Sequence, residues 1–492
     1  MIDLVLLLSV PVLFGVSLKR PDRALLLWLL LSPLSQDPMR PFGVEIPISN
    51  LFDRLSTIAI ALGLLASGQF WRLFANPFSK FEKAIVIFIL IFLLEGVGEG
   101  LVALHPREIL RTGYVAFDTF IIPCFFYFLL KYLLTRGGTY NDRMEDRMAT
   151  TLTLVGFYLA CMSVYEGITL HDLFPAPESN LSILMGGGLR IGSPRTNGPF
   201  YQPEILGQYL SLILLFFLYR WRVRLRARST SRTSAKGLAI PYILLMLLGM
   251  YFNQFRSIWL GFFGGHATRY IFSRRGRLTF LLVVFLVSIL GATTWHMLSR
   301  TQLYVDRITN TETFYSRVSA WLYAFRAFSE HPLMGLGYDQ LRLYIFRAHD
   351  AGDDMRFMGA FASFSAHNTF ITMLAENGIL LTVPFCFLVC YFFGQVRARV
   401  RSAQSYADVE FGLFAVAAGF AIFFVQLFDR MYYFAKFQNL VFVIFALVTA
   451  RNSRSAGAIA TTASADEASM AARITERKAQ DNSGRTQSTF VR

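Results

Sequence analysis

A histidine and an asparagine, His367 and Asn368, lie where a polar stretch gives way to an apolar run in FSAHNTFITMLAENGILL. A helix that starts here has free N–H groups and a positive dipole end, which favour a nearby anion, and Ser363 or Ser365 could cap it. A neutral imidazole can accept a proton from a hydroxyl group near pH 7. The pair is therefore a candidate for acid–base chemistry. The competing interpretation is a polar residue that anchors a helix at a membrane surface.

Arginines in two other stretches could bind such an anion. Arg256 lies in NQFRSIWLGFFGG, a tight turn between two apolar runs, where an arginine is costly unless it meets an anion. Arg195, with Arg190 as the alternative, lies in GGGLRIGSPRTNGPFYQPEILGQYL, which glycines and prolines shape into a loop. The competing interpretations are a lipid headgroup contact for Arg256 and a solvated loop arginine for the other two.

A further segment, FYSRVSAWLYAFRAFSEHPLMGLGYDQL, has an amphipathic helical pattern and holds Arg317 and Arg326, whose guanidinium groups offer bidentate donors. Pro332, Gly335 and Gly337 are expected to end that helix in a turn. The helix could lie on a membrane as a lid. The alternative is a helix that packs over the rest of the protein.

Other kinds of chemistry lack their sequence signals. The chain has no Walker loop, no HExxH, no CxxC and no convincing Ser–His–Asp spacing. The only tight acidic pair in the stretch 299–366, Asp353 with Asp354, is a weak metal signal because Mg²⁺ needs more ligands or substrate phosphates. All four cysteines lie inside apolar runs and predict neither disulfides nor zinc. The sequence therefore predicts no metal and no cofactor.

The elements that must position these residues belong to a membrane protein. The chain is 54% hydrophobic and only 16% charged, with a mean hydropathy of +0.45, outside the range of ordinary soluble domains. Its net charge of +15 comes from short basic clusters between apolar runs, as topology signals do, so no nucleic-acid partner is expected. The sequence predicts one all-α transmembrane domain over residues 1–450 and a disordered cytoplasmic tail over 451–492.

The apolar runs predict about a dozen transmembrane helices. One short run contains Pro33, so counts of twelve and thirteen are equally defensible and the orientation of the amino terminus stays open. The candidate spans cover about 1–18, 24–36, 55–70, 83–103, 109–130, 148–168, 200–219, 237–252, 257–273, 278–298, 367–396, 411–428 and 435–450.

Basic clusters set the expected topology. Those at 220–236, 274–277 and 397–401 are of the kind retained on the cytoplasmic side. This assignment puts loop 299–366 outside, although it carries seven arginines, because long loops translocate largely regardless of charge. The stretch around Arg195 and the turn at Arg256 fall on the same outer side.

Together these residues resemble the O-antigen ligase and polysaccharide polymerase superfamily, over roughly 190–450. The shared carboxyl-terminal pattern of that superfamily appears here in order as Arg317, Trp321, His331-Pro332, Gly335-Leu336-Gly337 and His367-Asn368. The ligase motif RxxxL is present from Arg256 to Leu260. A second ligase pattern begins at His367 and reaches Gly378, but its last position is Leu381 instead of glycine, threonine or tyrosine, which weakens the choice of ligase over polymerase.

The resemblance implies a GT-C-like bundle of 12 or 13 helices whose large periplasmic loop contains helices. It also implies a metal-independent, inverting glycosyltransferase at the periplasmic face of a bacterial inner membrane. The donor would be a glycan on undecaprenyl diphosphate, and the acceptor a glycan hydroxyl such as that of lipid A core. Arginines can stabilise the charge of the leaving diphosphate, with Arg195 and Arg256 as first choices and Arg317 as third. His367 would be the general base, supported by Asn368, Arg190 and Arg326.

Two other functions remain open at this stage. A polymerase of the same superfamily would join repeat units of O-antigen or exopolysaccharide by the same chemistry. A polysaccharide transporter or flippase is less favoured, because it would show related halves and polar or broken helices at mid-membrane. Here polarity concentrates in one external loop and its neighbours.

Overall fold

The structure, a computed structural model, describes most of the chain. The described residues are 2–35, 50–75, 78–102, 113–136, 140–171, 173, 196–200, 202–227, 234–271, 312–352, 366–403 and 405–451. Every regular element among them is a helix. The all-α class is therefore confirmed for this part of the chain.

The amino-terminal helices follow the apolar runs. Pro21 begins α2, because its fixed φ and missing N–H suit a first helical turn. The same helix ends two residues before Pro33, which has no N–H to donate to a helical carbonyl, and Ser32–Leu34 forms a 3₁₀ turn instead. These helices are α1 (Ile2–Lys19), α2 (Pro21–Leu31), α3 (Leu51–Ala66) and α4 (Lys80–Val102).

Five further helices follow. The carboxamide oxygen of Asn141 accepts a hydrogen bond of 3.1 Å from the amide of Met144 and so caps α7. A π-helical segment, η4 (Phe117–Ile121), leads directly into α6. The helices are α6 (Ile122–Thr135), α7 (Asp142–Thr169), α9 (Pro203–Ala227), α10 (Ser234–Asn253) and α11 (Arg256–Ile271).

The carboxyl-terminal part supplies two kinds of helix. The amphipathic segment inside predicted loop 299–366 forms α14 (Glu312–Glu330), which α15 (Leu341–Asp350) follows. Long apolar runs form α16 (Thr369–Arg401), α17 (Tyr406–Gln426) and a helix over 435–451, referred to below as the last helix.

Twelve of the thirteen predicted spans overlap a described helix, and the other, 278–298, lies outside the described residues. Five described helices are long and apolar enough to cross a membrane by length and composition: α1, the helix over Gly113–Thr135, α7, α16 and α17. The count of twelve or thirteen spans stays a prediction. So do the single domain over 1–450 and the disordered tail over 451–492, of which only Arg451 is described.

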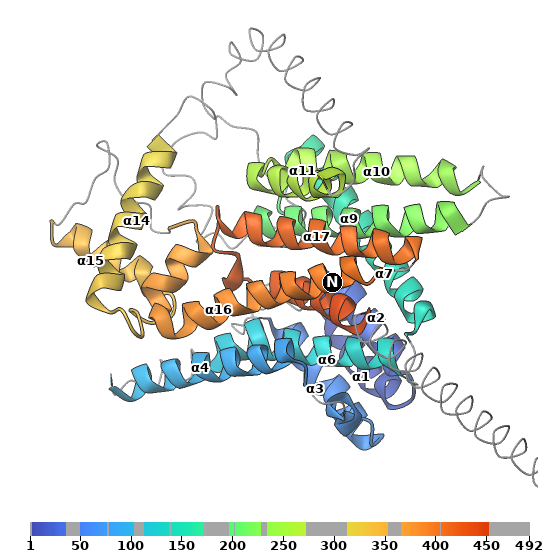
Figure 1. Cartoon of the computed structure of the whole chain (residues 1–492), viewed down its shortest axis with the longest axis horizontal. Coiled ribbons are helices and arrows are strands. Elements are labelled where there is room, and N and C mark those ends of the chain that lie inside the picture. Colours follow the sequence, from blue (N-terminus) through green and yellow to red (C-terminus); the bar gives the residue numbers. More distant parts are fainter. Residues whose placement is uncertain are drawn as a thin grey trace, which may run out of the picture.

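The helix bundle has two chemically different ends. Arg220 of α9 and Arg451 of the last helix both pair with Glu145 in the first turn of α7, and Lys131 of α6 pairs with Glu82. At the opposite end of the long helices, α14 and α15 lie beside the start of α16 (Figure 1). The end with these ion pairs is referred to below as the basic end, and the end with α14 and α15 as the α14 end.

Helix α16 is interrupted at Gly378, whose φ of +59° and ψ of −161° only glycine adopts without strain. Residues 332–337 dock into this break, because four backbone hydrogen bonds of 2.8–3.1 Å join them to residues 375–380. A Cβ at position 378 would lie 2.3 Å from the carbonyl oxygen of Leu333, so the close approach also requires glycine.

The elements at the α14 end have a small apolar core of their own, separate from the large core of the bundle. It is formed by α14, α15 and the first turns of α16, with Ala320, Tyr323, Ala324, Ala327, Leu341, Ile345, Ala366 and Ala375 buried in it. This packing fixes α14 against the segment that carries His367 and Asn368.

Candidate functional site at the α14 end

His367 is held in a strained conformation directly before α16. Its φ of +45° is in the left-handed region, which costs a non-glycine residue on the order of 1–3 kcal/mol. The cap of α16 is Asn368, whose carboxamide oxygen accepts a hydrogen bond of 3.0 Å from the amide of Ile371. The suggestion that Ser363 or Ser365 caps this helix was therefore wrong, because the polar residue adjacent to the helix takes that role.

Residues after His367 bind a second segment of chain, the turn that follows α17. The carboxamide nitrogen of Asn368 donates to the carbonyl oxygen of Leu427 at 3.0 Å. The hydroxyl of Thr369 donates to the carbonyl oxygen of Asp429 at 2.8 Å. These two contacts bring the start of α16 and the end of α17 together, although the residues are about 60 positions apart in sequence.

The turn places a carboxylate beside the histidine. Nδ1 of His367 lies 3.7 Å from Oδ1 of Asp429, and the Asp429 side chain is only 8% exposed. Oδ1 also accepts a hydrogen bond of 2.7 Å from the amide of Arg430, which fixes the carboxylate. A proton on Nδ1, facing Asp429, leaves Nε2 as the nitrogen that can accept a proton. A separation of 3.7 Å is longer than a hydrogen bond, so Asp429 acts through its charge and would stabilise the imidazolium that a general base becomes.

Arg317, on α14, completes a cluster of charges around this pair. Burial lowers the pKa of Arg317, while the nearby carboxylates of Asp429 and Glu204 raise it and the charge of Arg256 lowers it. Three charged groups from other parts of the chain thus lie within electrostatic reach of Arg317. Nε of Arg317 is buried and has no hydrogen-bond partner within the described part of the chain. A bound anion would satisfy this donor.

Trp321 links α14 to the histidine segment. Its indole nitrogen donates a hydrogen bond of 2.6 Å to the carbonyl oxygen of Ala366, the residue before His367. Arg317 lies one helical turn earlier than Trp321, so both side chains are on the same face of α14. The spacing of arginine and tryptophan in the motif therefore has a physical reason.

Glu376 holds the turn between α14 and α15. Its buried carboxylate accepts hydrogen bonds of 3.1 and 3.2 Å from the amides of Asp339 and Leu341. The side chain of Asp339 in turn pairs with Arg430 at 3.2 Å, next to Asp429. The turn that carries the GxG motif is thereby connected to the residue that faces His367.

The remaining predicted site residues are placed differently. Arg256 is the first residue of α11 and is exposed. Arg326 lies nine residues after Arg317 on α14, where Nε donates to Glu330 at 3.0 Å, and the structure does not bring it into the cluster. Arg190 and Arg195 lie outside the described residues. Thr196, the next residue, is buried and accepts a hydrogen bond of 3.0 Å on its carbonyl oxygen from Asn253.

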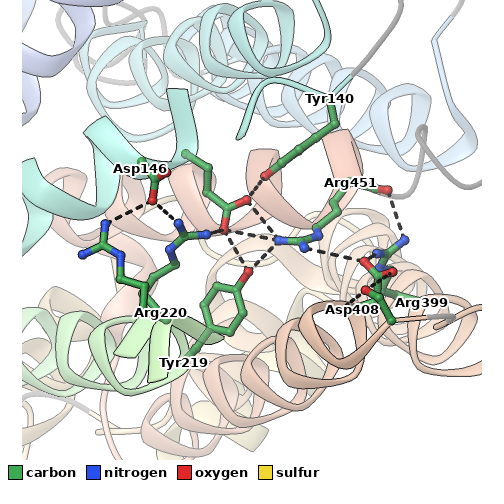
Figure 2. A network of polar contacts seen from close by, with 10 residues as sticks. Tyr140, Asp146, Tyr219, Arg220, Arg399, Asp408 and Arg451 are labelled. Atoms are coloured by element: carbon green, nitrogen blue, oxygen red, sulfur yellow. Dashed lines mark hydrogen bonds and ion pairs between the residues drawn. The ribbon is translucent and has the colours of Figure 1, made fainter. Parts of the chain in front are cut away.

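The basic end holds a different charge network, in which Figure 2 shows arginines pointing toward acids and tyrosines of neighbouring helices. Arg451 donates to Glu145 at 3.0 Å and to the hydroxyl of Tyr219 at 2.6 Å. Arg399 contacts the carbonyl oxygen of Arg451 at 3.3 Å and pairs with Asp408. Because these charges are paired with one another and most of them are buried, the network joins the ends of five helices, as a structural role requires.

Sequence reasoning missed three acids of the α14 end: Asp429, Glu204 and Glu376. A signal existed for Asp429, since the charged pair Asp429-Arg430 follows directly after an apolar run on the predicted outer side. Glu204, in the first turn of α9, looks in sequence like an ordinary helix-start acid. Among the described residues no three His, Cys, Asp or Glu side chains are grouped as metal ligands would be.

Comparison with known families agrees with the motifs. Residues 241–386 match a family model described as O-Antigen ligase, which confirms the predicted resemblance over the part of the chain that carries Arg256, Arg317, Trp321, His367 and Asn368. A search of curated proteins found no match. The family and the apolar helices together indicate a multi-pass membrane protein with a ligase or polymerase type of glycosyl transfer.

Proposed function

We propose that this protein is an inverting, metal-independent glycosyltransferase that moves a glycan from undecaprenyl diphosphate to a sugar hydroxyl, as an O-antigen ligase does with lipid A core. The observation that carries the proposal is the pairing of His367 with Asp429, 3.7 Å apart, beside two arginines at one end of the bundle. The α14 end would face the periplasm of a bacterial inner membrane, because the basic clusters favour a cytoplasmic location for the basic end.

The proposed reaction is a single displacement. The acceptor hydroxyl oxygen attacks the anomeric carbon while the bond from that carbon to the diphosphate oxygen breaks, which inverts the anomeric centre. Nε2 of His367 takes the hydroxyl proton, and Asp429 stabilises the imidazolium that forms. The electron pair of the broken bond leaves with the diphosphate.

Arginines supply the stabilisation that the leaving group needs. Arg317 and Arg256 offer guanidinium donors to the oxygens on which negative charge develops. The buried Nε of Arg317 is a donor that such an oxygen would satisfy. Arg195 and Arg190 belong to the proposal through the sequence alone, as does a supporting role for Arg326.

The test is transfer by purified, reconstituted protein with a lipid-linked glycan diphosphate and candidate acceptors, without ATP and with EDTA. His367→Ala should lower the rate by at least about 100-fold, since a positioned base contributes about 10²–10⁴-fold. His171→Ala is the matched control, because His171 is exposed beyond the end of α7 and is not part of the cluster. Near-native turnover of His367→Ala would reject the base, and loss of transfer in EDTA would reject the metal-free mechanism.

The second candidate, a polymerase, is favoured by Leu381, which departs from the ligase pattern. The length of the product separates the two functions in the same assay. A ladder of repeat units indicates a polymerase, and one coupling to the acceptor indicates a ligase.

A further inference from the structure

The outer face of α14 is apolar, although its other face is already packed in the core of the α14 end. Phe314, Leu322 and Phe325 are 56%, 43% and 49% exposed, and Val318 is half-buried between them. Their spacing puts them along one side of the helix. A helix that faced water on this side would carry polar residues there.

The same apolar surface continues onto the turn after α14 and onto α15. Leu333 is 64% exposed and Met334 41%, both in the turn that docks at Gly378. On α15, exposed Leu343 lies between two exposed arginines, Arg342 and Arg347. Apolar side chains next to arginines with long apolar stems are typical of helices at the surface of an anionic bilayer.

The depth of this turn in a membrane follows from α16. The charge network at the basic end includes Arg399, which lies 21 residues after Gly378 on the same helix. At 1.5 Å per residue, this is about 31 Å, close to the thickness of roughly 30 Å for the hydrocarbon core of a bilayer. The turn 331–334, which binds the backbone at Gly378, therefore lies at the outer limit of that layer.

Helix α4 gives the same depth independently. A Cβ at Gly98 would be 3.7 Å from the methyl carbon of Met334, and Gly98 lies 18 residues after Lys80 at the basic end, about 27 Å along the helix. Leu90 and Leu94, on α4 below this contact, are also exposed. The turn thus lies next to α4, the helix that carries these exposed apolar residues.

We propose that the outer face of α14, the turn 331–334 and α15 bind the bilayer surface, with the apolar side chains below the headgroups and Arg342 and Arg347 among anionic headgroups. The partner is a lipid surface, and the leaflet is the one at the α14 end. The proposal rests on the exposed apolar residues and on the two depths calculated from helix length. It does not depend on the enzymatic function.

The experiment places a small fluorescent amino acid at Phe325, Leu333 or Leu343 of the full chain in nanodiscs that contain phosphatidylglycerol. Quenching is measured with lipids brominated near the headgroup, with lipids brominated near the bilayer centre, and with iodide in water. The same label at Leu90 of α4 sets the level for lipid contact. The label at Asp350, the exposed polar end of α15, sets the level for water contact.

We expect the lipid brominated near the headgroup to quench the label at all three positions more strongly than the lipid brominated near the bilayer centre. This quenching should be at least about half of that seen for the label at Leu90 with whichever bromolipid quenches Leu90 more. Iodide should quench Asp350 more than any of the three. Strong iodide quenching without lipid quenching would overturn the proposal, because the face would then lie in water. Protection from all three quenchers would overturn it as well, because protein would then cover the face.

Discussion

Replacement of Gly378 by alanine should detach residues 332–337, the segment that docks at the break in α16. The φ and ψ of Gly378 cost a residue with a Cβ about 1–3 kcal/mol. The new Cβ would lie 2.3 Å from the carbonyl oxygen of Leu333, which is backbone and can move away only if its hydrogen bonds break. The two bonds donated by the amides of Ile379 and Leu380, at 3.0 and 3.1 Å, contribute about 1 kcal/mol each.

The expected loss is therefore about 3–5 kcal/mol in the local stability of this contact. Gly394, sixteen residues later on α16, is the matched control, since a Cβ there meets no atom within 4 Å. Gly394→Ala should be neutral or stabilise the helix by up to about 1 kcal/mol.

Hydrogen exchange of the purified protein in nanodiscs measures this stability directly. In Gly378→Ala the amides of residues 336, 337, 379 and 380 should exchange at least about 100-fold faster, as a loss of about 3 kcal/mol requires. Exchange at these four amides indistinguishable from that in Gly394→Ala would refute the docking of the turn at the helix break.

Three further changes have defined outcomes. Lys436→Met should cost about 3–5 kcal/mol in thermal or denaturant unfolding, because the buried carboxylate of Asp53, 2.6 Å from Nζ, is left charged, and Asp53→Leu with Lys436→Met should recover most of the loss. Trp321→Phe should lower the transfer rate roughly tenfold with the fold intact, since the bond to the carbonyl oxygen of Ala366 orients the histidine segment. Asp429→Asn should lower kcat, measured as the transfer rate at saturating donor, at least about 100-fold. The KM for the donor should not change.

Each of these has its contrary result. Lys83→Met, on the exposed side of α4, should change the free energy of unfolding by less than about 0.5 kcal/mol. If Lys436→Met has an effect as small as that, the pair of Lys436 with Asp53 does not stabilise the fold. A wild-type transfer rate in Trp321→Phe would mean that this bond does not position the site. A rise in KM for the donor with kcat retained in Asp429→Asn would make Asp429 a binding residue.

The sequence predicted the helices well, because apolar runs and prolines act locally. Pro33 is an example, since its missing N–H ends α2 whatever the rest of the fold does. Arg317 and Trp321 came from the resemblance to a family motif, and their spacing of four residues places both on one face of α14.

The acids of the site could not be predicted in the same way. Asp429 reaches His367 only because Asn368 and Thr369 bind the turn after α17, a contact between segments about 60 residues apart. Arg326 has a local partner that the sequence does contain. Its Nε lies 3.0 Å from the carboxylate of Glu330, four residues later on the same helix, and a supporting role for Arg326 stays a prediction.

The proposed donor site is tested most directly by the affinity of the purified protein in nanodiscs for undecaprenyl diphosphate without its glycan. Arg256→Gln and Arg317→Gln should each weaken binding about tenfold or more, since a charged hydrogen bond to phosphate contributes about 1.5–3 kcal/mol. Arg143→Gln, exposed at the basic end, removes the same charge and should bind like the wild-type protein. Unchanged affinity in both Arg256→Gln and Arg317→Gln would contradict a diphosphate site at the α14 end.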